Sequence, residues 1–201
     1  MHPNGRFNEI TQCVLLTRLG RRSEKPPGFT LLQALIALAI VGVLVAIAQP
    51  IYAHADANVR IGEAKVEIYH SLLAAMNQAM VASTPVVMCS SSDSQRCGKD
   101  VDWTQGWIVF ADKDMNRDRG PEEALIRRQP RLNEQMRVLS TLGRTRLVFQ
   151  PNGGNAGSNV TFTICHARGR GRAASILLAN NGRIRQAPAT PEAKAICEGD
   201  Y

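Results

Sequence analysis

Two arginines near the end of the chain, in the stretch ANNGRIRQA, are spaced so that they could bind an anion together. Alternate side chains of a β-strand point to the same face, so a strand here would present Arg183 and Arg185 side by side while Ile184 points inward. A guanidinium group donates paired N–H bonds to phosphate oxygens, and Gly182 would let a phosphate or a turn approach the backbone closely. The pattern suggests recognition of a polyanion; a solvated strand end is the alternative.

A wider block of positive charge surrounds this pair. Between Gln135 and Pro191 the chain has no Asp, Glu or Lys, and its charged residues there are all arginines: Arg137, Arg144, Arg146, Arg168, Arg170, Arg172, Arg183 and Arg185. Charge of one sign attracts polyanions, although a solvated basic face has the same composition. The stretch ARGRGR places Arg168, Arg170 and Arg172 in a glycine-spaced loop that could follow a phosphate backbone. Without an aromatic platform in these loops, binding to a nucleic acid would be sequence-tolerant and salt-sensitive.

The run DKDMNRDRGPEE raises the question of a metal site. Its acidic and amide residues fall at positions 1, 3, 5, 7 and 12 of an EF-hand calcium loop: Asp112, Asp114, Asn116, Asp118 and Glu123. The glycine required at position 6 is replaced by Arg117, and the flanking segments are typical of strands rather than helices. A solvated hairpin tip is therefore the favoured interpretation, and no metal site is predicted.

The other residue patterns offer no catalytic chemistry. The sequence contains no Ser–His–Asp arrangement and no His and Cys cluster at metal-ligand spacing. We therefore predict that the protein is not an enzyme and needs no cofactor.

The N-terminal part of the chain contains a segment that could anchor the protein in a membrane. A basic patch ends at Lys25, and from Phe29 to Gln49 the chain carries no charge. As a helix this segment rises about 30 Å, enough to cross the hydrocarbon core, and the basic patch would keep its start in the cytoplasm. Residues 29–50 are therefore predicted to be a transmembrane helix. The apolar run is too long for a secretory signal peptide, and the small residue, Gly28, lies before it.

The anchor is predicted to continue as an amphipathic helix over 51–84. Apolar or small residues recur at alternating spacings of four and three, which predicts one buried stripe: Ile51, Ala55, Val59, Gly62, Val66, Tyr69, Leu73, Met76 and Met80. After Pro85 the pattern changes to eight short runs separated by turn signals, from PVVMC to GRIRQ. Such spacing predicts an antiparallel β domain over 85–201 with a basic C-terminal tail. The fold class is therefore α+β.

The stretch GFTLLQALIALAIVGVL resembles the class III leader junction of type IV pilins and pseudopilins. The resemblance implies that prepilin peptidase removes residues 1–28, cutting between Gly28 and Phe29, and that Phe29 becomes N-methylated. It also implies other major and minor pilins as partners. Pilins usually carry glutamate where this chain has Gln33, and the uncharged amide would weaken pairing with a neighbouring N-terminus. That departure favours a minor subunit at or near a filament tip; neutral drift is the alternative.

Two further stretches, DWTQGWIVFADKDMNRDRGPEEALIRR and LVFQPNGGNAGSNVTFTICHARGRG, are similar to the GspH/FimT family of minor pilins and pseudopilins. This resemblance implies a pilin-like fold, in which a long helix is packed on an antiparallel β-sandwich of two sheets. It also implies a single-pass inner-membrane protein whose globular domain lies in the periplasm before incorporation into a pilus. The FimT branch shares a G-R-x-R motif, here Gly182 to Arg185, and is associated with DNA binding in natural transformation. DNA is thus the expected polyanion, and a structural GspH-like pseudopilin or a pilus-initiating subunit without DNA binding is the alternative.

The cysteines fit an oxidising compartment once the leader is removed. Loss of Cys13 would leave four cysteines, which allow three pairings. We favour Cys89–Cys97, which would close a short polar loop, together with Cys165–Cys197, which would attach the C-terminal tail to a strand and enclose GRIRQ.

Overall fold

The computed structural model of this chain describes residues 28–157, 159–166 and 172–198, which belong to two compact units divided after Leu44. The predicted leader, apart from Gly28, lies outside the described residues, as do Arg168 and Arg170. The first unit contains the N-terminal part of helix α1, and the second contains the rest of α1 with both sheets.

Helix α1 spans Leu31–Ala82. It begins with a capping box, in which the Thr30 hydroxyl accepts from the Gln33 N–H at 3.3 Å and the Gln33 amide oxygen accepts from the Thr30 N–H at 3.0 Å. Ser83, the residue that follows the helix, takes the left-handed conformation (φ 51°) common after the last helical residue. Leu31–Gln49, with a mean hydropathy of 2.8, is long and apolar enough to cross a membrane.

The buried face of α1 differs from the predicted stripe. The helix buries a neighbouring face, lined by Ala57, Ile61, Ala64, Ile68, Ser71, Leu72, Ala75, Met76 and Ala79. Of the predicted stripe, Met76 is buried, whereas Val59, Val66 and Met80 are about half exposed. Apolar residues occur on both faces of this half-helix, so periodicity alone did not distinguish them. Small alanines lie on the buried face because they let the helix approach the sheets closely.

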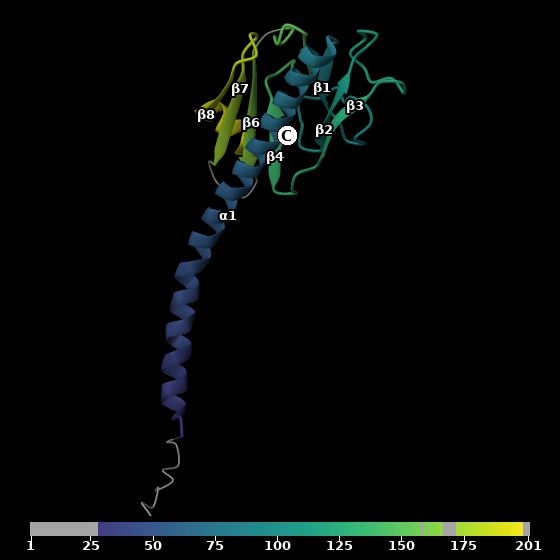
Figure 1. Ribbon diagram of the computed structural model, residues 1–201. Helices are drawn as coiled ribbons and strands as arrows, with labels where there is room; N and C mark the ends of the chain where they lie inside the picture. The colour runs from purple at the N-terminus through teal and green to yellow at the C-terminus, as the bar shows by residue number, and fades with distance from the viewer. Residues whose placement is uncertain (1–27, 158, 167–171, 199–201) are drawn as a thin grey trace, which may run out of the picture. The chain divides into compact units, whose positions relative to one another are not determined.

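Eight antiparallel strands follow, one for each predicted run. They are β1 (Val86–Ser90), β2 (Gly106–Ala111), β3 (Leu125–Pro130), β4 (Met136–Ser140), β5 (Arg146–Phe149), β6 (Val160–His166), β7 (Ala173–Leu178) and β8 (Ile184–Pro188). One sheet has the order β3-β2-β1-β5 and the other β4-β6-β7-β8. The two sheets and the C-terminal half of α1 lie against one another in Figure 1. This arrangement confirms the predicted pilin-like α+β fold.

The main core lies between α1 and one face of each sheet. It joins Ile68 and Leu72 of α1 to side chains of both sheets, including Phe149 of β5 and Phe162 of β6. The Trp107 indole N–H donates to the Ser71 hydroxyl at 2.9 Å, which satisfies the buried serine of the helix. A second apolar cluster covers the other face of the first sheet and includes Val87, Cys89, Ile108 and Phe110.

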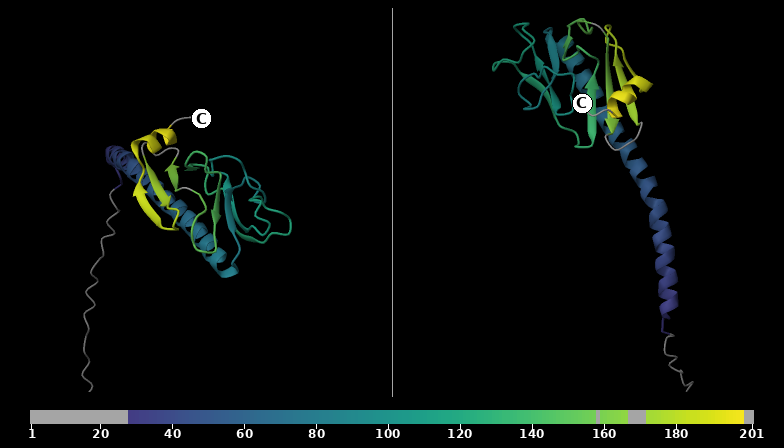
Figure 2. Two further views of the ribbon diagram at one scale, coloured as in Figure 1. Left: turned by 90° about the horizontal axis from the view of Figure 1, so that it is seen from above. Right: turned by 180° about the vertical axis from the view of Figure 1, so that it is seen from behind.

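A short C-terminal helix, α2 (Pro191–Glu198), was not predicted. The Thr190 hydroxyl caps it by accepting from the Ala193 N–H at 3.2 Å, and Pro191 occupies the first helical position. Thr-Pro-Glu is a helix-start signal that sequence reasoning overlooked. In both views of Figure 2, α2 lies beside the second sheet, where it contacts β6 and β7.

Candidate functional site

The candidate arginines lie on the hairpin that joins β7 to β8. The Gly182 N–H donates to the Ala179 carbonyl at 3.0 Å, and the Ala179 N–H donates to the Arg183 carbonyl at 3.0 Å. Gly182 has φ +78°, the left-handed conformation that such a turn requires in its last residue. The Asn181 side chain also accepts from the Arg183 N–H at 3.2 Å, which fixes where β8 begins.

This turn is supported by the glycine-rich loop after β5. A Cβ added at Gly182 would lie 2.4 Å from the Gly153 carbonyl oxygen, so the two backbones touch. The Asn155 N–H donates to the Asn180 carbonyl at 2.8 Å, and the Asn180 N–H donates to the Asn159 side chain at 3.1 Å. Gly182 of the G-R-x-R motif is therefore required by the packing of the turn, whether or not the motif binds a ligand. Sequence reasoning missed this pairing because the two loops are distant in the chain.

Arg183 and Arg185 are both exposed, and Ile184 between them packs against the main core. β8 is the edge strand of its sheet, so nothing in the sheet lies beyond it. Among the described residues, neither arginine forms an ion pair. The arrangement offers two neighbouring guanidinium groups to solvent.

Two other described arginines of the basic block, Arg172 and Arg146, lie away from this pair. Arg172 precedes β7 at its far end, about 17 Å along the strand from the residue opposite Arg185, and its guanidinium donates to Asn58 of α1 at 3.0 Å. Arg146, on the other sheet, binds Asp118 at 2.6 Å. The uninterrupted positive run of the sequence is therefore divided between separate places in the fold.

Two of the cysteines are bonded to one another. Cys89 and Cys97 form a disulfide that closes the short loop after β1. Cys165 is also disulfide-bonded. The side chain of Cys197 lies outside the described part of the chain, so its pairing with Cys165 stays a prediction.

Comparison with known proteins identifies the family. A family model described as the type II transport protein GspH matches residues 66–182 and so ends just before Arg183. None of the curated proteins matches the chain.

Three solved structures resemble this fold. The minor pilin FimU of Pseudomonas aeruginosa aligns with a TM-score of 0.53 at 17% identity, covering 65% of this chain and 90% of FimU. In a second crystal form of FimU the TM-score is 0.47 at 18% identity, with 63% and 92% covered. The minor pseudopilin EpsH of the Vibrio cholerae type 2 secretion system has a TM-score of 0.47 at 14% identity, with 64% and 97% covered.

The family match covers more than half of the chain and includes the last third of α1, from residue 66 onward, and seven strands, β1 to β7. The likeness to FimU shows the same fold of an N-terminal helix and antiparallel sheets. By its sequence and its fold, this chain belongs to the GspH family of type II transport proteins.

Proposed function

We propose that this protein is a minor pilin that binds DNA through Arg183 and Arg185, for DNA uptake in natural transformation. The observation that carries the proposal is the pair of exposed guanidinium groups of Arg185, on the edge strand β8, and Arg183, just before it, without an ion-paired acid among the described residues. The planar guanidinium group of arginine can donate paired hydrogen bonds to phosphate oxygens. The turn that precedes β8 is stabilised by the contact between Gly182 and Gly153. Binding is to the phosphate backbone, so it tolerates any sequence and weakens with salt.

The test is fluorescence anisotropy of a labelled short DNA duplex, titrated with the full chain in a non-ionic detergent across a salt series. For the unchanged protein we expect a log–log salt slope near −3, which corresponds to three or four phosphate contacts. The Arg183→Ala, Arg185→Ala double variant should bind at least about 10-fold more weakly, and its slope should be smaller in magnitude by about 2, because two contacts are lost.

Arg128→Ala, Arg131→Ala is the matched control. Both residues are exposed at β3 of the other sheet, and the double change removes the same two charges. If it weakened binding as much as the Arg183, Arg185 variant, net charge rather than the hairpin would be responsible. Equal affinity of the unchanged and the Arg183, Arg185 proteins would reject the proposed site.

A structural subunit without DNA binding is the second candidate function, either a GspH-like pseudopilin of a type II secretion system or a pilus-initiating pilin. It is favoured by the exposed apolar residues of α1: Val59, Val66, Tyr69, Leu73 and Met80. Apolar surface of this kind marks a contact with another protein, which in a pilin would be a neighbouring subunit. Co-purification with other pilins, together with the absence of DNA affinity at low salt, would favour this function.

Leader removal gives a separate prediction. Gly28→Ala should block most of the processing by prepilin peptidase, so intact-mass spectrometry should find the full-length chain instead of a product that begins at methylated Phe29. Gly42→Ala is the control, because Gly42 is a residue of α1 at which an added methyl group would contact nothing within 4 Å. Normal mature mass in the Gly28 variant would contradict cleavage at this position.

A further inference from the structure

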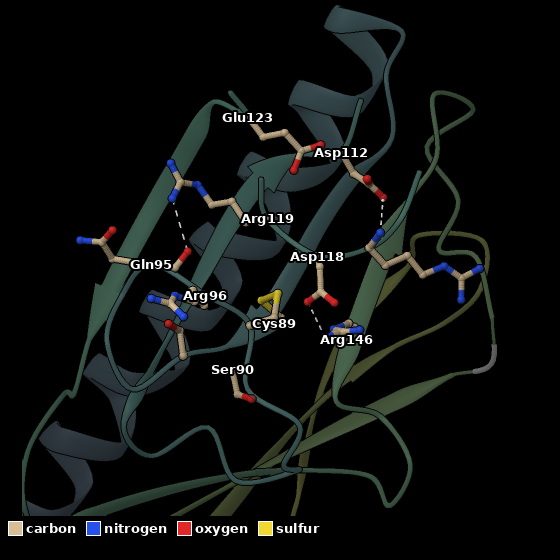
Figure 3. The surroundings of a disulfide bond; sticks show 12 residues. Cys89, Ser90, Gln95, Arg96, Asp112, Asp118, Arg119, Glu123 and Arg146 are labelled. Atoms are coloured by element: carbon tan, nitrogen blue, oxygen red, sulfur yellow. Dashed lines mark hydrogen bonds and ion pairs between the residues drawn. A yellow bond between two sulfur atoms is a disulfide. The ribbon is translucent and has the colours of Figure 1, made fainter. Parts of the chain in front are cut away.

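We propose that the loop between β2 and β3 is a calcium-binding site built by Asp112, Asp114 and Glu123. One carboxylate oxygen from each of the three residues lies within 4.8 Å of those of the other two. Asp112 and Glu123 are buried at the base of the loop and Asp114 is exposed. Figure 3 shows the Asp112 and Glu123 carboxylates beside one another, near the Cys89–Cys97 disulfide.

A buried oxygen without a partner points to a ligand here. Asp112 is 1% exposed, its Oδ2 accepts from the Arg117 N–H at 3.2 Å, and its Oδ1 has no hydrogen-bond partner. A buried carboxylate oxygen that is left unsatisfied is costly, and a cation bound between the three carboxylates would satisfy it. Burial raises the pKa of Asp112, and the negative charges of Glu123 and Asp114 act in the same direction.

The loop has the left-handed backbone that an EF-hand loop needs at its sixth position, although the residue there is not glycine. Arg117 stands at position 6, where an EF-hand loop needs glycine, yet it takes the left-handed conformation with φ 65°. That conformation turns its N–H toward Asp112 at position 1. Glu123 at position 12 accepts from the Lys113 N–H at 2.8 Å and from the Gly120 N–H at 2.9 Å, so it connects positions 2 and 9 of the loop.

Calcium suits this arrangement better than magnesium. Calcium takes six to eight oxygens in a flexible geometry, whereas magnesium requires near-ideal octahedral geometry and gives up its water reluctantly. Asn116 at position 5 and the backbone carbonyl at position 7 are the further oxygens that the loop count supplies. The Asp118 side chain binds Arg146 instead, and Arg119 donates to the Gln95 carbonyl at 3.3 Å, so both arginines anchor the loop rather than fill the site.

The test uses the full chain in detergent, stripped with a chelator and then titrated with calcium chloride in a calorimeter. We expect one site with a dissociation constant of about 10⁻⁴ to 10⁻³ M, the range of extracellular calcium modules. About 10 mM calcium should raise the unfolding temperature by about 3–10 °C, and the same concentration of magnesium should raise it less. The absence of both binding heat and a calcium-specific shift would overturn the site.

Neighbouring glutamates give a matched pair of variants. Glu123→Gln should weaken calcium binding at least about 10-fold, whereas Glu122→Gln removes the same charge from an exposed neighbour and should leave it unchanged. Asp114→Asn is a second test, because this exposed residue is replaced without disturbing the core. Equal calcium binding by the Glu123 and Glu122 variants, or by the Asp114 variant and the unchanged protein, would overturn the assignment. The outcome does not depend on DNA binding.

Discussion

Replacing Leu72 with alanine is expected to destabilise the protein by about 2–5 kcal/mol, the usual cost of such a deletion in a well-packed core. Leu72 is completely buried on the face of α1 that packs against the two sheets. Chemical denaturation in detergent measures the change. Trp103 and Trp107 report it by fluorescence, because both are buried in the same core and become exposed on unfolding.

The next residue supplies the control. Leu73→Ala makes the same chemical change with the same helix propensity, but Leu73 is 40% exposed, so we expect a cost of about 1 kcal/mol or less. The difference between the variants therefore measures which face of α1 is buried. A larger cost for Leu73 than for Leu72 would mean that the helix buries the stripe predicted from periodicity.

Gly182→Ala is expected to cost about 2–5 kcal/mol for two separate reasons. The left-handed backbone at φ +78° is strained for alanine by about 1–2 kcal/mol. The new methyl group would also meet the Gly153 carbonyl oxygen at 2.4 Å, and relieving such overpacking costs about 1–3 kcal/mol. Denaturation by urea measures the sum.

Gly143→Ala separates the two terms. Gly143 has the same φ of +78°, but a Cβ there would meet nothing within 4 Å, so only the conformational strain of about 1–2 kcal/mol remains. Equal destabilisation by the two variants would show that the Gly182–Gly153 contact contributes nothing. A larger cost at Gly182 would identify the glycine of the motif as the support of the turn that presents Arg183.

Local patterns determined the elements of this protein. Short runs bounded by turn signals predicted all eight strands. In β4 and β5 the side chains alternate between buried and partly exposed positions, whereas β1 and β2 are buried on both faces. Val160, Phe162 and Ile164 are buried as that alternation required. The long uncharged run likewise predicted the helical anchor from length and charge alone.

Tertiary structure decided which surfaces of those elements meet. The face that α1 buries depends on the shape of the sheets below it, and small alanines pack there more closely than the larger side chains of the predicted stripe. The contact between Gly182 and Gly153 joins two loops that are far apart in the sequence, so the sequence did not predict it. The sequence also did not reveal that one Asp112 oxygen in the β2–β3 loop is buried without a hydrogen-bond partner.

The sequence by itself predicted that Arg183 and Arg185 share a face, since residues two apart do so on any strand, and in the structure both are exposed while Ile184 between them packs against the core. The sequence could not predict which other arginines lie near this pair, because residues that are close in the sequence can be far apart in the folded chain. The fold sends Arg146 to Asp118 on the opposite sheet and Arg172 to Asn58 on the helix. It leaves Arg183, just before β8, and Arg185, on β8, exposed, because no other described element covers their side chains.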